Sequence, residues 1–167
     1  MEIREMLLPE FDLEMKKTRA ILERVPEGRQ DYKPHEKSMP LGKLAAHTAR
    51  LPEFAQLIVE LPGMEVTERK HAPLVMESRQ QLLADFDAAA EKARTAITGA
   101  DDEKWLQHWK FTYQAKTIMD ESRQLTYRMM FLNHMVHHRA QLGVYLRLND
   151  VPLPGTYGPS ADDTMGF

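Results

Sequence analysis

Residues 121–148, ESRQLTYRMMFLNHMVHHRAQLGVYLRL, decide the fold class, because their apolar side chains recur at helical spacing around most of the circumference. A helix that is apolar nearly all round belongs at the centre of a helical bundle. Asp120 is the predicted N-cap of this helix. One face is expected to point into the core; it comprises Leu125, Met129, Leu132, Val136 and Ala140.

Three further helices are predicted from spacings of three and four residues between apolar side chains. They span residues 3–25, 40–61 and 76–98, and Pro52 is expected to kink the second one. Residues 100–119 are expected to form an aromatic connector with a short hairpin around Gln114 and Ala115. The predicted fold is therefore all-α, a four-helix bundle that occupies the whole chain, 1–167, as one domain.

Composition excludes several classes of function. The 22 basic and 25 acidic residues leave a net charge of −3 with no basic block, so no nucleic-acid partner is expected. The sequence has no run of about 18 apolar residues, so no membrane span is expected. The N-terminus also lacks the apolar core of a signal peptide, and together these features favour a cytoplasmic protein. Without cysteine, any metal site must use nitrogen and oxygen ligands, and any thiol must come from a small molecule.

The last predicted helix carries two histidines, His134 and His138, one turn apart, so their imidazoles lie on the same face. They belong to a second stripe, which consists of Tyr127, Phe131, His134, His138, Leu142 and Tyr145. His47 interrupts the apolar stripe of another helix. A single histidine on an apolar stripe, such as His47, is more often a hydrogen-bonded core residue than a metal ligand. Two histidines four residues apart on a helix can also occur by chance. Three imidazoles facing one core, however, could all be satisfied by one shared metal ion.

The remaining histidines have weaker patterns around them. His35 and His71 lie in polar loops and are expected to be solvated, whereas His108 could face a pocket or the surface. Arg139 and Arg147 follow the histidine pair and are expected to form structural ion pairs.

Several segments resemble the DinB-like (DinB/YfiT) family of metal-binding proteins, in the right order and over nearly the whole chain. They are residues 133–142 with 145–147, the tail 151–162, and residues 33–39 leading into 41–47. The resemblance implies a four-helix bundle of up-down-down-up type, a homodimer, and a metal held by His47, His134 and His138. Tyr32 stands where the family has tryptophan, which bears on the shape of the pocket.

Three protein ligands would leave a tetrahedral ion one open position, as in catalytic sites. Zinc, nickel, iron and copper all suit three imidazoles. Relatives in this family include thiol-dependent S-transferases and a mycothiol-dependent isomerase, so the resemblance favours transfer of a low-molecular-weight thiol to a small electrophile. A metal-dependent hydrolase and a non-catalytic binding module remain as alternatives. Glu53 and Asp120 are the carboxylates considered as a general base, and neither falls clearly on the histidine stripes.

Overall fold

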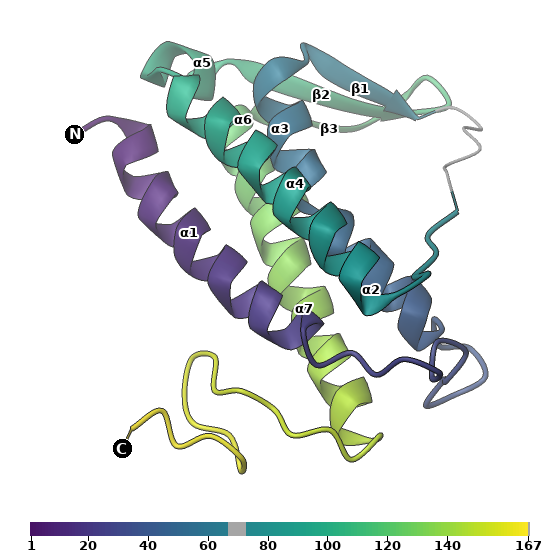
Figure 1. The fold of residues 1–167 in the computed structure, drawn as a ribbon. Helices are drawn as coiled ribbons and strands as arrows, with labels where there is room; N and C mark the ends of the chain where they lie inside the picture. Colours follow the sequence, from purple (N-terminus) through teal and green to yellow (C-terminus); the bar gives the residue numbers. More distant parts are fainter. Residues whose placement is uncertain (67–72, 167) are drawn as a thin grey trace.

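Five helices form the body of the computed structural model, which describes residues 1–66 and 73–166. They are α1 (Ile3–Leu22), α2 (Leu41–Arg50), α3 (Pro52–Glu60), α4 (Arg79–Gly99) and α7 (Asn133–Arg147). Helix α4 packs against the first three helices, and α7 packs against α1 and α2 (Figure 1).

The predicted kink at Pro52 is confirmed as a break between two helices. Helix α2 ends at Arg50, and Pro52 occupies the first position of α3. Proline suits that position, because its ring fixes a helical φ and the amide it lacks would have no partner within the helix. The break lets α2 and α3 both lie against α4.

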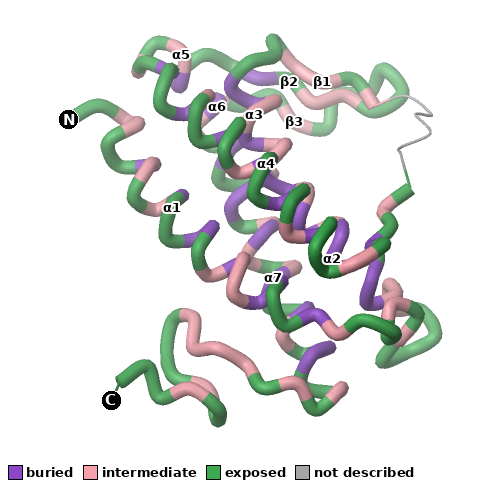
Figure 2. Tube along the Cα trace, viewed as in Figure 1, coloured by how far each residue is buried: buried purple, intermediate pink, exposed green. Residues whose placement is uncertain are grey.

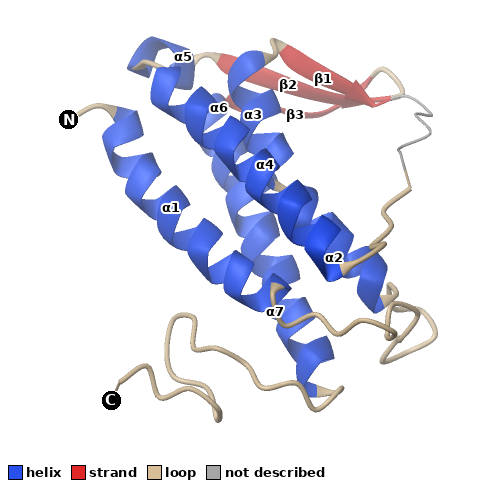
Figure 3. Cartoon of the chain, in the orientation of Figure 1, coloured by secondary structure: helices blue, strands red, loops and turns tan. Residues whose placement is uncertain are grey.

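The all-α prediction requires correction, because the fold contains a small three-stranded sheet at one end of the helices (Figure 3). Strand β1 (Gly63–Val66) pairs in parallel with β2 (His108–Tyr113), and β2 pairs antiparallel with β3 (Lys116–Ser122). The predicted hairpin is confirmed: Gln114 and Ala115, at its turn, have φ of 47° and 62°. Gly63 permits the parallel pairing, since a Cβ there would lie 2.7 Å from the Lys110 carbonyl oxygen.

The predicted last helix is interrupted at its N-terminal end. Asp120 lies within β3, and Ser122 is the cap instead, because its hydroxyl accepts a hydrogen bond from Leu125 N at 3.3 Å. The segment continues as α6 (Arg123–Thr126), a π-helical turn η1 (Tyr127–Leu132) and α7. The short helix α5 (Asp102–Leu106) precedes β2.

The core lies where the helices face one another, and the outer sides are exposed (Figure 2). Trp105 and Trp109, from the predicted aromatic connector, are fully buried. Arg123 is also buried, and it donates hydrogen bonds to the carbonyl oxygens of Ile58 and Leu61, at the end of α3. These contacts attach the sheet end of the fold to the helices.

The C-terminal tail after α7 is extended, as the sequence predicts, and hydrogen bonds hold it against the helices. Arg24, just past α1, donates to the Pro152 carbonyl at 3.0 Å, and Arg139 of α7 donates to the Tyr157 hydroxyl at 2.8 Å. In the described part of the chain, no helix is both long enough and apolar enough to cross a membrane.

Candidate metal centre

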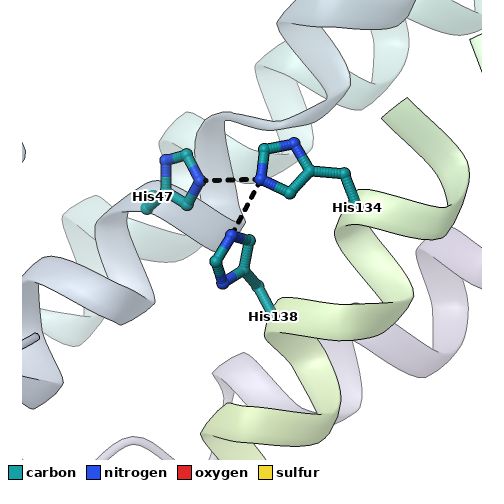
Figure 4. A group of neighbouring side chains, drawn as sticks. All are labelled: His47, His134 and His138. Atoms are coloured by element: carbon teal, nitrogen blue, oxygen red, sulfur yellow. Dashed lines mark hydrogen bonds between the residues drawn. The ribbon is translucent and has the colours of Figure 1, made fainter. Parts of the chain in front are cut away.

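Two helices bring the three predicted histidines together. Helix α2 supplies His47, and the first two turns of α7 supply His134 and His138 (Figure 4). The i, i+4 spacing stacks the two α7 rings on one face, with ring centroids 4.6 Å apart. The His47 ring lies against both, at centroid distances of 5.2 and 4.6 Å.

The Nε2 atoms are the atoms that converge. His134 Nε2 lies 3.4 Å from His47 Nε2 and 2.8 Å from His138 Nε2. Across residues 1–66 and 73–166, this is the one group of three or more His, Asp or Glu side chains whose donor atoms all lie within 4.8 Å of one another. Nitrogens bound to one tetrahedral ion at about 2.0–2.1 Å lie roughly 3.4 Å apart. The first pair has that spacing, and the second pair would have to open by about 0.6 Å.

Burial favours the neutral form of the imidazoles of His47 and His138. Desolvation, reinforced by the neighbouring His138 and His134, lowers the pKa of His47 to about 4. Desolvation also lowers the pKa of His138, although its hydrogen bond to Gln141 opposes the shift. The neutral imidazole is the form that binds a metal ion, so the surroundings favour the ligand state near neutral pH. The group could therefore hold a metal ion, whose identity the ligand set leaves open.

The far sides of the two α7 rings are also hydrogen-bonded. His134 Nδ1–H donates to the Met130 carbonyl at 3.3 Å, and His138 Nδ1–H donates to Gln141 Oε1 at 2.8 Å. Each bond places the proton on Nδ1 and leaves the Nε2 lone pair facing the centre. Sequence reasoning missed both partners, although Gln141 stands one turn after His138.

The π-helical turn η1 sits directly before α7 and sets the phase of the histidines. Such turns often occur at functional sites.

The inward face predicted for the last helix is wrong in most of its members: Leu125, Met129 and Ala140 are exposed, and Leu132 is buried. The second stripe is confirmed, because its aromatic and aliphatic members are buried and its histidines are half-buried.

The other histidines that the structure describes do not belong to this group. His35 is exposed, and its Nδ1 accepts a hydrogen bond from Lys37 N. His108 is exposed and pairs with Asp120 at 3.0 Å, so of the two alternatives it faces the surface and not a pocket. His137 is exposed, with its ring against that of His138. His71 lies outside the described residues.

The charged candidates are engaged elsewhere. Glu53 pairs with Arg50 at 3.4 Å, and both line a cavity of about 500 Å³ against α4. Arg139 pairs with Glu14, and Arg147 pairs with Asp162, so the prediction of structural ion pairs is confirmed. Glu14 was detectable in the sequence, as a charge on the apolar stripe of the first helix.

One protein-family model and several solved structures match this chain. The model of the DinB family matches residues 4–165. The chain belongs to the DinB family. No curated protein matches this DinB-family chain. Among solved structures it resembles a DinB-like protein from Bacillus cereus ATCC 10987, with 19% identity and a TM-score of 0.72 over 93% of this chain and 98% of that one. It also resembles a DinB-like protein from Bacillus subtilis, with 18% identity and a TM-score of 0.62 over 87% and 92%. At these identities the likeness concerns the fold.

Proposed function

We propose that this DinB-family protein is a metal-dependent enzyme that transfers a low-molecular-weight thiol to a small electrophile. The observation that supports it is the convergence of three imidazole Nε2 atoms, from His47, His134 and His138, in a group that includes no carboxylate among the described residues. Three protein ligands leave a fourth position for an exogenous group, which is the pattern of catalytic sites.

The chain itself contributes binding, orientation and desolvation. A bound divalent ion supplies Lewis acidity, which lowers the pKa of a thiol and stabilises the thiolate. The chain contains no cysteine, so the thiol is a substrate. In the transfer, the sulfur forms a bond to the electrophilic carbon, the leaving group departs with its bonding pair, and the thiol proton passes to solvent. Burial lowers the pKa of His47 and His138, which favours the neutral, metal-binding form of these two rings.

Hydrolysis ranks below thiol transfer, because the carboxylates considered as a general base are occupied. Glu53 pairs with Arg50, and Asp120 pairs with His108 and Lys110 on the exposed surface of the sheet. A base for water activation would thus have to come from a group other than these two.

We also propose that the chain forms a homodimer. Apolar side chains remain exposed along α6, η1 and α7, namely Leu125, Met129, Val144 and Leu148, each between 42% and 58% exposed. Burying such side chains against a second copy would remove apolar surface from water, which is favourable. In a two-fold dimer the same residues of both copies would contribute to the interface.

The experiment combines metal analysis with activity. The purified protein, reconstituted with Zn²⁺, Ni²⁺ or Fe²⁺, is expected to retain one ion per chain and to consume an electrophile only when a thiol is present. Assays would pair a panel of thiols with a panel of electrophiles, with ester and amide substrates alongside. Turnover of the esters or amides without thiol would favour the hydrolase, metal uptake without turnover would favour a binding module, and failure to retain any metal would sink the proposal.

A further inference from the structure

An imidazole binds a metal through one nitrogen only when its proton sits on the other. A partner that accepts a hydrogen bond from the far nitrogen therefore selects the tautomer and fixes the ring plane. In metal centres such partners commonly change metal affinity by about 10–100-fold. The two α7 histidines both have one.

One of the two hydrogen-bond acceptors is a backbone atom and the other is a side-chain atom. His134 Nδ1–H donates to the Met130 carbonyl, which is part of the backbone of η1 and is present whatever residue stands there. His138 Nδ1–H donates at 2.8 Å to Gln141 Oε1, a side-chain atom on the following turn of α7. Only the second bond can be lost through a side-chain substitution.

We propose that Gln141 is a positioning residue of the metal centre: its amide oxygen holds the His138 proton on Nδ1, so that the Nε2 lone pair points at the site shared with His134 and His47. The inference rests on the proposed metal function. Gln141 is exposed and acts only through His138. It lies on the far side of the ring from His134 Nε2, since the His138 ring joins the two contacts through opposite nitrogens.

The test measures Zn²⁺ affinity by competition with a chromogenic chelator at pH 7.5. Gln141→Met is expected to weaken binding by about 10–100-fold, because His138 loses its tautomer selection. Gln141→Glu is expected to bind at least as tightly as wild type, because a carboxylate accepts the same hydrogen bond and raises the basicity of the ring. Gln56→Met is the matched control; Gln56 is likewise hydrogen-bonded to a side chain on its own helix, Glu60.

A second readout comes from nitrogen-15 spectra of the metal-free protein. Wild type should show the Nδ1–H tautomer at His138, and Gln141→Met should shift His138 toward the Nε2–H tautomer, which a merely structural role would not do. Equal Zn²⁺ affinity of wild type and Gln141→Met would overturn this inference while the metal centre stands. The inference would also be overturned if Gln141→Glu lost as much Zn²⁺ affinity as Gln141→Met. A wild type that takes up no Zn²⁺ overturns the proposed function, and this inference with it.

Discussion

Arg139 Nη2 lies 2.7 Å from Glu14 Oε2, and this ion pair joins α7 to α1 inside the core, one residue after His138. Glu14 and Arg139 are only 4% and 3% exposed. Arg139 also donates to the Thr18 hydroxyl, and Glu14 has a second cation, Lys17, at 3.3 Å. Burial raises the pKa of Glu14, but hydrogen bonds from Tyr157 and Arg139 outweigh it and the net shift is downward.

Removing either partner of this pair should destabilise the fold by about 3–5 kcal/mol, because the other charge stays buried. Glu14→Met should cost more than Arg139→Met. Glu14 keeps Lys17 in the second variant, whereas in the first Arg139 loses the one carboxylate that it contacts among the described residues. Urea denaturation of the metal-free variants measures this. The double variant should be more stable than the sum of the single losses predicts; simple additivity would contradict the pairing.

Tyr157→Phe should loosen the C-terminal tail. The Tyr157 hydroxyl donates to Glu14 Oε2 at 2.7 Å and accepts from Arg139 at 2.8 Å, so its loss leaves two buried charges with one partner fewer. The expected cost is about 1–3 kcal/mol, with faster amide hydrogen exchange across residues 151–163. Tyr113→Phe, at an exposed tyrosine of β2, is the control. Unchanged exchange in the tail would show that the hydroxyl does not hold it.

His138→Ala should abolish stable metal binding, whereas His137→Ala should leave one ion per chain. The two residues are adjacent, but only His138 directs Nε2 to His134, while His137 is exposed. Elemental analysis after dialysis distinguishes them. Metal lost from His137→Ala and kept by His138→Ala would mean that the phase of α7 differs from the one described.

The metal-free protein should lose stability as the pH falls from roughly 6.5 toward 4. Burial and the neighbouring imidazoles lower the pKa of His47 from 6.5 to about 4, and burial lowers that of His138. The unfolded chain therefore binds more protons in this window, so the free energy of unfolding decreases on acidification. Below about 4.5, protonation of Glu14 adds to the loss. Denaturation curves at several pH values test this. His47→Asn removes one imidazole with a lowered pKa, so the free energy of unfolding of this variant should depend less on pH between about 6.5 and 4. Burial of His47 shifts proton competition for this ligand to lower pH, so Zn²⁺ affinity of the folded protein should fall as the pH approaches its lowered pKa of about 4.

The homodimer should sediment at about twice the chain mass of 19.3 kDa at micromolar concentration. Val144→Glu and Met129→Glu place charges on the exposed apolar face of the last helical segment and should shift the protein toward monomer. Ile118→Glu, at an equally exposed apolar residue of β3, should not. A wild-type protein that sediments only as a monomer would contradict the proposal.

The histidine pair and the buried stripe around it could be predicted from sequence, because each depends on the local repeat of one helix. His134 and His138 share a face through their spacing alone, and the buried Phe131 and Leu142 continue that face. The approach of His47 could be inferred only as a hypothesis, since it depends on how two helices pack.

What could not be predicted depends on distant or irregular contacts. Strand β1 has four residues and no alternating burial, and it exists because Gly63 lets the backbone approach Lys110 far along the chain. The partnership of Glu14 with Arg139 likewise joins distant segments. The inward face containing Leu125 and Met129 was mispredicted because a constant 100° per residue does not hold through a π-helical turn.

The π-helical turn Tyr127–Leu132 determines which changes of chain length this segment can accept. A π-helical turn holds one residue more than an α-helical turn, so deleting one residue there and restoring a regular helix would leave the phase of the following residues nearly unchanged. A one-residue deletion or insertion in regular α-helix has no such compensation, because it rotates everything that follows by about 100°. Lineages that keep the three histidines should therefore tolerate the loss of one residue within Tyr127–Leu132 better than a change of length between His134 and His138.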